Sequence, residues 1–133
     1  MPTNKKIGND FEIEFCEMLY KEGFWVHNLA MNQAGQPADV IAVKNGKAHL
    51  IDCKVCTGKK FTLSRIEENQ HLAMDLWWER GNGYGWFAIK IEDNIYMVDS
   101  HVLKYFSKTQ SSMNERELFN VGKTFKEWVK LCE

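Results

Sequence analysis

Apolar residues near the start of the chain recur at the spacing of one helix face. Between residues 9 and 22, just after Gly8, a turn of about 100° per residue brings the apolar side chains onto one arc. The arc consists of Phe11, Phe15, Met18 and Leu19. The acidic residues of this stretch lie on the opposite side, except Glu12, which falls inside the arc. The pattern therefore predicts an amphipathic helix with one carboxylate turned inward.

Five shorter stretches have the composition of β-strands. They are residues 24–28, 38–43, 48–55, 85–91 and 95–98. The sequence Lys-Asn-Gly-Lys at residues 44–47 predicts a hairpin, because Asn-Gly readily supplies the positive φ angles of a tight turn. Residues 32–37 are rich in turn-forming residues and separate the first strand from the second.

A second helix is predicted from Ser64 to about Gly81, where Ser64 and Glu67 have the spacing of a capping box. Its buried stripe is centred on Ile66, Ala73 and Trp77. Gln70 lies within this stripe, whereas His71 falls on the outer side among acidic residues. A second covering element thus places a polar side chain inward.

The order of these elements is helix, three strands, helix, two strands and a helical tail, which indicates an α/β layer fold. We expect a single domain over residues 1–133, with a mixed sheet of about five strands flanked by helices. The core spans about residues 7–98, and residues 99–133 form a helical C-terminal extension. Within the extension we expect a loop near residues 108–113 and a last helix from about Thr124.

The strand over residues 48–55 carries charge where a central strand is usually apolar. Side chains alternate along a strand, so Ile51, Cys53 and Val55 point one way and Leu50, Asp52 and Lys54 point the other. An acid and a lysine therefore share one face, and the hairpin brings Asp39 close to them. Burying such groups costs free energy that something must offset.

Composition restricts how the protein could bind nucleic acid and in which compartment it works, but it does not determine the function. The net charge of −1 argues against a grip on nucleic acid by the whole surface, so any basic surface is local. Four scattered cysteines and no apolar leader or membrane span predict a reducing, cytoplasmic protein, or one in a host cytoplasm if it is phage-encoded. Cys53 and Cys56 form a CxxC, but a strand directs them to opposite faces, which disfavours zinc or redox use.

Each inward polar residue also has a purely structural interpretation. An inward Glu12 or Gln70 is about as often a helix-end residue or a partner of loose backbone groups as a functional residue. Asp52 and Lys54 are compatible with an ion pair on an edge strand. Together, however, three separate elements each direct polar groups to one place, which favours a functional cluster.

The motif Pro37-Ala38-Asp39, followed after twelve residues by Asp52-Cys53-Lys54, resembles the signature of the PD-(D/E)xK nucleases. Gly8 and Glu12 in a helix before the first strand resemble the start of Holliday junction resolvases. The helix from Ile66 to Gly81 with its Gln70 is similar to that of RecU-type and phage resolvases, and VRR-NUC nucleases share much of this pattern. Ala38 separates the proline from Asp39, which departs from the signature, whereas Asp at position 52 is within it.

The resemblance implies a restriction-endonuclease-like core and a metal-dependent endodeoxyribonuclease acting in DNA recombination or repair. It places Mg²⁺ or Mn²⁺ on Asp39, Asp52 and the backbone carbonyl of Cys53, with Glu12 as a ligand or an outer acceptor. The metal would neutralise the phosphate and lower the pKa of a bound water. Lys54 would orient that water and steady the pentacovalent phosphate, Gln70 would position water or phosphate, and the products would carry 5′-phosphate and 3′-hydroxyl ends.

The expected substrate is a four-way DNA junction. Two strands of a junction are cut in symmetry, and one site per chain therefore implies a homodimer. The apolar residues of the tail either form its interface or pack on their own domain: Val102, Leu103, Tyr105, Phe106, Phe119 and Trp128. We expect DNA contacts from four lysines that flank the site in the sequence, unless these are merely solvated: Lys5, Lys6, Lys59 and Lys60.

Two other functions remain open from the sequence. One is a VRR-NUC-like or repair nuclease that cuts flaps or other branched DNA. The other is a non-cleaving DNA-binding module that kept the fold, which the intact set of Asp39, Asp52 and Lys54 disfavours.

Overall fold

The computed structural model describes residues 2–29 and 38–133, so the turn expected at residues 32–37, with Pro37, lies outside the described residues. The helices are α1 (Asn4–Lys21), η2 (Leu63–Arg65), α2 (Glu68–Glu79), α3 (Ser100–Ser107), α4 (Glu115–Val121) and α5 (Phe125–Leu131). The strands are β1 (Trp25–Asn28), β2 (Val40–Lys44), β3 (Lys47–Cys56), β4 (Lys60–Thr62), β5 (Trp86–Ile91), β6 (Asn94–Asp99), β7 (Ser112–Asn114) and β8 (Lys123–Thr124). No helix in these ranges is long and apolar enough to cross a membrane.

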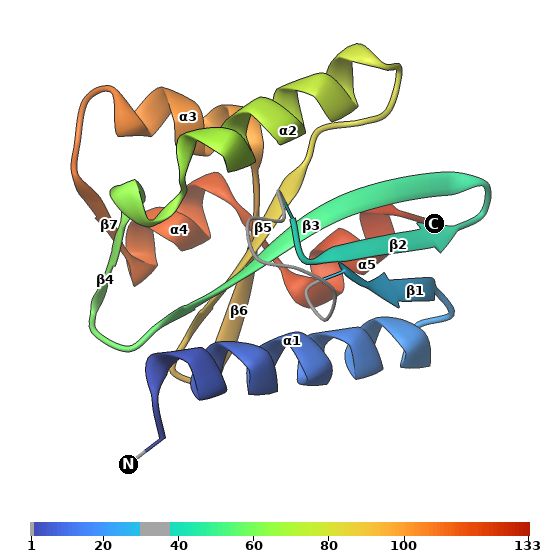
Figure 1. The fold of residues 1–133 in the computed structure, drawn as a ribbon, viewed down its shortest axis with the longest axis horizontal. Helices are drawn as coiled ribbons and strands as arrows, with labels where there is room; N and C mark the ends of the chain where they lie inside the picture. Colours follow the sequence, from blue (N-terminus) through green and yellow to red (C-terminus); the bar gives the residue numbers. More distant parts are fainter. Residues whose placement is uncertain (1, 30–37) are drawn as a thin grey trace.

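A six-stranded mixed sheet in the order β1-β2-β3-β5-β6-β8 forms the centre of the molecule (Figure 1). The pair β3–β5 is parallel and its neighbours are antiparallel. A second, two-stranded sheet pairs β4 with β7. The predicted α/β class and mixed sheet are confirmed, with one strand more in the main sheet than expected.

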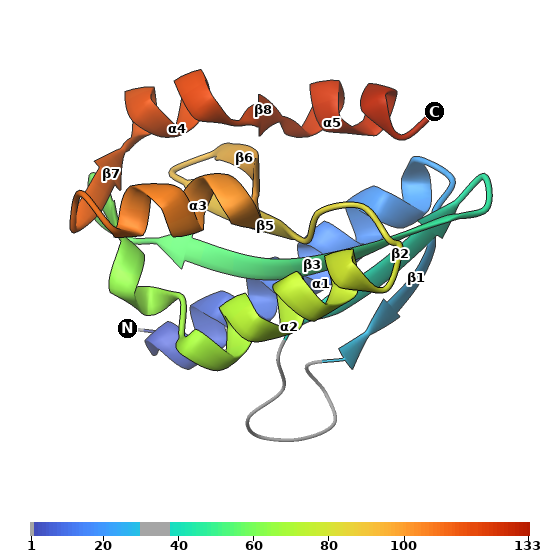
Figure 2. The same ribbon diagram turned by 90° about the horizontal axis from the view of Figure 1, so that it is seen from above.

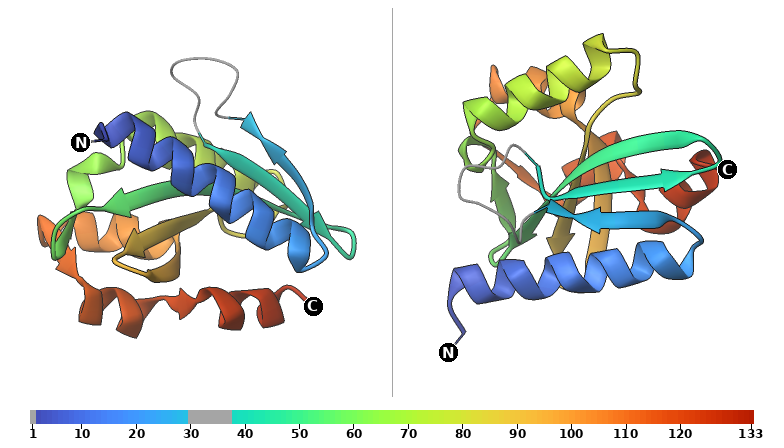
Figure 3. Two further views of the ribbon diagram at one scale, coloured as in Figure 1. Left: turned by 90° about the horizontal axis from the view of Figure 1, so that it is seen from below. Right: turned by 45° about the vertical axis from the view of Figure 1, so that its right-hand side comes forward.

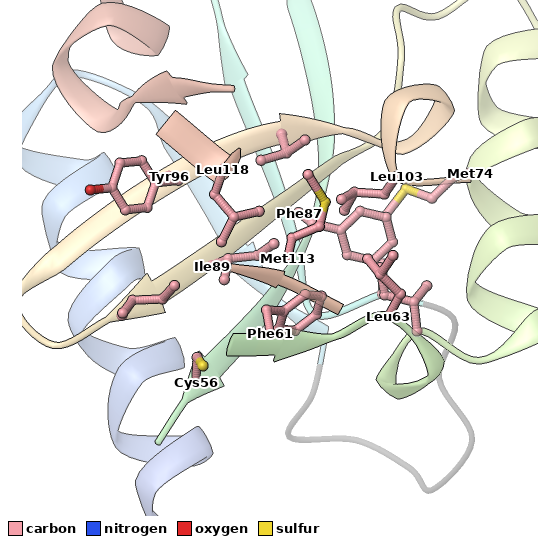
Figure 4. Close-up of a cluster of buried hydrophobic side chains, with 14 of the residues drawn as sticks. Cys56, Phe61, Leu63, Met74, Phe87, Ile89, Tyr96, Leu103, Met113 and Leu118 are labelled. Atoms are coloured by element: carbon pink, nitrogen blue, oxygen red, sulfur yellow. The ribbon is translucent and has the colours of Figure 1, made fainter. Parts of the chain in front are cut away.

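Helices cover both faces of the sheet, as the view along it shows (Figure 2). On one face, the side chains of α1 and α5 pack with alternate residues of β2 and β3. On the other face, α2, α3 and α4 pack over β5 and β6, where Met74 and Leu103 lie beside Phe87 (Figure 4). Because β3 is covered on both faces, a charged side chain on it is placed in a buried setting.

The hairpin predicted at residues 44–47 joins β2 to β3. Asn45 has φ of 54° and Gly46 has φ of 76°, the two positive values that a type I′ turn requires. The register of this hairpin pairs Val40 with Ile51. It thereby sets how far Asp39 lies from the charged part of β3.

Helix α1 begins five residues earlier than the apolar pattern predicted. Thr3 caps it, because its hydroxyl oxygen accepts a hydrogen bond from the Lys6 backbone N–H at 3.1 Å. Gly8 therefore lies inside the helix and does not precede it. The predicted inward arc is correct at Phe11, Phe15 and Leu19, which are buried.

The predicted capping box of the second helix was wrong. Ser64 lies in the short turn η2, and α2 begins at Glu68 with a box between Glu67 and Gln70 instead. Met74 is the fully buried apolar residue of α2, whereas the predicted Ala73 and Trp77 are only partly buried and Ile66 precedes the helix. His71 is half-buried against the Phe87 ring at 6.3 Å between centroids, so its predicted outward position was wrong as well.

The predicted helical C-terminal extension contains the helices α3, α4 and α5, and it also contributes strands that the sequence analysis did not predict. It supplies β7 to the small sheet and β8 to the edge of the large sheet, and it passes from one face of the large sheet to the other. Gly122 allows this passage, because a Cβ atom there would lie 2.8 Å from a Val98 methyl and 2.9 Å from the Met97 carbonyl oxygen. The chain then ends near the β2–β3 hairpin (Figure 3). The short strands of this segment were missed because two or three residues carry no readable periodicity.

Trp128 is the largest side chain that the C-terminal segment buries. It is fully buried and stacks on Phe24 with ring centroids 5.6 Å apart. We expect Trp128→Ala to lower the free energy of unfolding by about 3–5 kcal/mol, the usual cost of removing a buried aromatic side chain. Urea denaturation followed by circular dichroism measures this. The exposed neighbour Leu131→Ala serves as the control, and equal stabilities of the two variants would contradict the packing described.

Candidate active site

The candidate site lies where β2 begins, opposite the part of β3 that continues beyond the pairing of the two strands. Asp39, just before β2, donates its backbone N–H to the Ile51 carbonyl at 3.1 Å. Its side-chain Oδ2 accepts a hydrogen bond from the Cys53 N–H at 2.8 Å. The Asp39 carboxylate thus accepts the β3 backbone N–H that the carbonyl of one more paired residue would otherwise accept. The two segments are held together at the point where their acids meet.

Asp52 points to the α2 side of the sheet and is 1% exposed. Its Oδ1 accepts a hydrogen bond from Gln70 Nε2 at 3.2 Å. The other end of the Gln70 side chain, Oε1, accepts the Glu67 N–H at 3.1 Å in the capping box of α2. Gln70 therefore joins the start of α2 to the buried carboxylate, as its predicted inward position required.

Lys54 lies two residues further along the same face of β3. Its Nζ is 3.1 Å from Asp52 Oδ2, and its side chain is 15% exposed. The ammonium forms an ion pair with this buried oxygen. A carboxylate oxygen has more than one lone pair, so Oδ2 retains capacity to bind a further positive group.

Asp52 and Glu12, the two inward acids, both lie within the electrostatic influence of Asp39 and Lys54. Burial and the nearby charge of Asp39 raise the pKa of Asp52 well above its usual range, although Lys54 acts to lower it. Burial and Asp39 likewise raise the pKa of Glu12 to about 7, against a smaller lowering by Lys54. Glu12 of α1 is thus electrostatically part of the same site. Both shifts mean that the negative charge of the site is destabilised in the absence of a cation.

The chemistry of these donors fits a hard divalent cation with few protein ligands. Among residues 2–29 and 38–133 no group of three or more His, Cys, Asp or Glu side chains forms a metal cage. Mg²⁺ needs no cage, since it keeps several waters and takes one or two carboxylates. The Cys53 carbonyl points to the same edge of β3 as its N–H, toward Asp39, because both groups of a strand residue face one neighbour. Asp39, Asp52 and this carbonyl are therefore suitable ligands.

The raised pKa of Glu12 predicts how stability depends on pH without metal. Its folded pKa of about 7 exceeds the usual 4.5, so its contribution to stability is full below about pH 4.5 and is lost as the pH rises through 7. We expect the free energy of unfolding of the wild type in EDTA to fall relative to that of Glu12→Gln over this interval. Chemical denaturation of both proteins from pH 4 to 8 measures the difference. A constant difference would contradict the electrostatic coupling of Glu12 to the site.

The four cysteines do not form a metal or redox centre among the described residues. All are free, and Cys53 and Cys56 belong to the apolar clusters on opposite faces of the sheet. Burial raises the pKa of the Cys53 thiol, as do the surrounding acids, so that it stays protonated. The prediction that Cys53 and Cys56 face opposite sides of the sheet is confirmed.

A cleft of about 360 Å³ adjoins the acids on the side of Lys54. It lies between the first turns of α1 and the region where β3 leads into β4 and η2. Its lining is Asn4, Ile7, Gly8, Cys53, Lys54, Val55, Cys56, Thr57, Gly58, Lys60, Thr62 and Arg65. Of the lysines proposed for DNA contact, Lys60 lines this cleft, whereas Lys59 lines a separate hollow and the exposed Lys6 pairs with Asp10. Arg65 was not predicted as a site residue, because the sequence analysis placed it in the first turn of the second helix, outside the buried stripe.

The fold and this arrangement of two acids and a lysine define the PD-(D/E)xK nuclease superfamily. The family described as "Archaeal holliday junction resolvase (hjc)" matches residues 3–131. The chain belongs to this family. The match extends through the C-terminal segment, for which the sequence had offered no resemblance. No curated protein matches the sequence.

Two solved structures have the same fold. Hjc of Archaeoglobus fulgidus, a Holliday junction resolvase from an archaeal hyperthermophile, is 19% identical with a TM-score of 0.69. The match covers 92% of this chain and 95% of that chain. The bacterial homing endonuclease I-Ssp6803I is 14% identical with a TM-score of 0.64, over 99% of this chain and 93% of that chain. At these identities the likeness concerns the fold.

Proposed function

We propose that the chain is a Mg²⁺-dependent endodeoxyribonuclease that resolves four-way DNA junctions. The membership of the Hjc family supports the substrate, and the burial of Asp52 next to Lys54 and Asp39 supports the chemistry. A protein that only bound DNA would gain nothing from buried acids facing phosphate. The observation that carries the proposal is this buried carboxylate, which lies beside Asp39 and forms an ion pair with Lys54 at 3.1 Å.

Asp39 and Asp52 are the metal ligands in this proposal, together with the Cys53 carbonyl. When bound, Mg²⁺ neutralises charge on the scissile phosphate and makes water a better nucleophile. The hydrogen bond from the Cys53 N–H fixes the Asp39 carboxylate, so the ligand needs little rearrangement on binding. Glu12 either binds directly or accepts a hydrogen bond from a coordinated water, and its raised pKa supports a place close to the charge.

Lys54 holds the attacking water and stabilises negative charge on the phosphate as the bond to the leaving oxygen breaks. Its position 3.1 Å from Asp52 supports this role, since the carboxylate restrains the ammonium close to the proposed ligands. Gln70 acts as a positioning residue, because both ends of its amide are engaged by Asp52 and by the Glu67 backbone. Gln70 orients the Asp52 carboxylate through this hydrogen bond, and this effect does not require Gln70 to contact water or phosphate.

Paired incision of a junction further supports a homodimer, because each chain offers one set of these residues. The C-terminal segment supplies part of the exposed apolar surface: Tyr105 is 64% exposed and Phe119 is 57% exposed. Leu103 and Trp128 are buried in their own domain and are not available to a partner. We therefore propose a dimer whose interface excludes these two residues.

The function is tested by incubating the protein with end-labelled four-way junction, flap and linear duplex, each with Mg²⁺ or with EDTA. We expect two symmetrical cuts in the junction with Mg²⁺, leaving 5′-phosphate and 3′-hydroxyl ends, and none with EDTA. Preferential cutting of flaps would show a repair nuclease instead. Tight binding without cutting of any substrate would show a DNA-binding module and would overturn the proposal.

A further inference from the structure

The edge of β3 beyond its pairing with β2 presents two side chains in a row. Asp39 binds the N–H of Cys53 on this edge, and Arg65 donates from Nη1 to the Val55 carbonyl at 2.6 Å. Residues two apart in a strand direct their backbone groups to the same side and lie about 7 Å apart. The guanidinium therefore follows the proposed ligand along the same edge, two residues further along β3.

Arg65 is held in this place by two contacts. Besides the hydrogen bond to Val55, its guanidinium lies over the Phe61 ring at 5.5 Å from the centroid. Neither contact neutralises its charge, because one partner is a carbonyl and the other an aromatic ring. A fixed cation without an acidic partner among these contacts is suited to an anion from outside the chain.

The charge of the adjoining cleft is of one sign. Three cations line it, namely Lys54, Lys60 and Arg65, and its lining among the described residues contains no aspartate or glutamate. This contrasts with the acid-rich ligand site next to it and with the net charge of −1 of the whole chain. The cleft is thus a local site for negative charge beside the proposed reaction centre.

Gly8 on the α1 wall of the cleft has no explanation within the fold. Its φ is not positive, and an added Cβ atom would meet nothing within 4 Å. A glycine inside a helix is less stable than alanine at the same position, so the fold alone would favour alanine here. A ligand that approaches the helix closely accounts for the missing side chain.

We propose that this cleft binds the DNA backbone phosphate next to the scissile one, with Lys60 and Arg65 as its cations and Gly8 providing clearance. The inference rests on the proposed nuclease function and extends it from the reaction centre to the path of the cut strand. That strand follows the β3 edge from Asp39 toward Arg65 and lies against the first turns of α1. Lys54 stands between the two phosphates, since it belongs both to the reaction centre and to the cleft lining.

The first test uses Lys60→Gln, whose site is exposed and does not endanger folding. Junction affinity is measured in EDTA over a series of salt concentrations, with Lys126→Gln on α5 as the matched control. We expect Lys60→Gln to weaken binding by about fivefold and to reduce the salt slope by about one, because one phosphate contact is lost. The control should bind as the wild type does. Unchanged affinity and slope for Lys60→Gln would overturn the inference.

The second test locates the phosphate. Junctions carry a single neutral methylphosphonate at each position around the branch point, and each is bound to the wild type and to Lys60→Gln. We expect one position at which the neutral group weakens wild-type binding but adds nothing in Lys60→Gln. Additive effects at every position would contradict a contact between this lysine and one phosphate. If that position is found but no DNA is cut with Mg²⁺, the proposed function fails while the cleft assignment stands.

The third test concerns Gly8. We expect Gly8→Ala to raise the melting temperature by about 2–4 °C, since alanine favours the helix, and to weaken junction binding severalfold. A stabilised variant that binds the junction as tightly as the wild type would show that nothing approaches this wall of the cleft.

Discussion

Replacing Asp52 with asparagine is expected to lower the rate of junction cleavage on the order of a thousandfold. The variant keeps the shape of the side chain and an oxygen for Gln70, but it loses the charge that the cation requires. Binding to the junction should be unchanged or tighter, because a negative charge near the phosphate is removed. Single-turnover cleavage with Mg²⁺ and a binding titration in EDTA separate the two effects.

The same substitution makes an independent prediction for stability. Since burial and Asp39 raise the pKa of Asp52, the stability linked to its neutral form is present at low pH and is lost as the pH rises. Asparagine is neutral at every pH, so the variant in EDTA should be more stable than the wild type at pH 8. Asp93→Asn, at an exposed turn, is the matched control for stability.

For the cleavage prediction, an Asp52→Asn variant that cuts the junction at the wild-type rate would contradict the assignment of Asp52 as a ligand.

Lys54→Ala is expected to reduce the cleavage rate by about a hundredfold or more, a larger effect than the loss of junction affinity that removing one cation of the cleft causes. Two losses combine: the charge that stabilises the phosphate is absent, and the pKa of Asp52 rises further because Lys54 normally lowers it. The residual activity should therefore require a higher pH and more Mg²⁺ than that of the wild type. Rates measured from pH 6 to 9 at several Mg²⁺ concentrations test this.

The control for this prediction is Lys126→Ala on α5, which removes an exposed lysine far from β3 in the sequence. It should leave both the rate and the pH profile unchanged. A uniform fall in rate for Lys54→Ala, with the wild-type pH profile retained, would show that the lysine does not govern the ionisation of Asp52.

The acid–lysine pair could be predicted from the sequence because it depends only on alternation along one strand. A central strand with Asp52 and Lys54 on one face violates the apolar pattern, and the Asn-Gly hairpin fixes the register that brings Asp39 to it. Both signals are local. The position of Glu12 was likewise predicted from the helical spacing of its neighbours.

Gln70 was predicted at the correct place from a partly incorrect pattern. The buried stripe was assigned to Ala73 and Trp77, whereas Met74 is the fully buried residue of α2. Gln70 lies close to both the predicted and the observed buried face of the helix, so its inward direction was predicted correctly. Its second contact, with the Glu67 backbone, depends on where α2 begins, which the Ser64 signal misplaced.

The cleft and the C-terminal strands could not be predicted because they depend on contacts between distant segments. Arg65 becomes significant only once the pairing of β3 with β2 is seen to end before Val55, leaving its carbonyl free to accept the guanidinium. In the same way β7 pairs with β4, about fifty residues earlier in the chain. Such short strands are stabilised by contacts with neighbouring segments, and their own sequences are too short to show alternation.

Acids and cations occupy neighbouring parts of the β3 edge, and this arrangement determines the electrostatics of the site. Burial and the charge of Asp39 raise the pKa of Glu12, and in the proposed function a divalent cation would offset this cost and the repulsion between the acids and phosphate. In the proposed arrangement, the acid-free cleft beside them would attract the DNA strand without a basic surface elsewhere. A protein with net charge −1 can in this way bind DNA at one place.

The central claim, that Asp39 and Asp52 together hold a divalent cation, is tested most directly by electron paramagnetic resonance of Mn²⁺. The ion is titrated into the protein–junction complex of the wild type and of Asp52→Asn, and the free Mn²⁺ signal gives the number of ions bound. We predict that the wild-type complex binds at least one more ion per chain than the variant complex at sub-millimolar free Mn²⁺. Equal binding by the two complexes would contradict the claim.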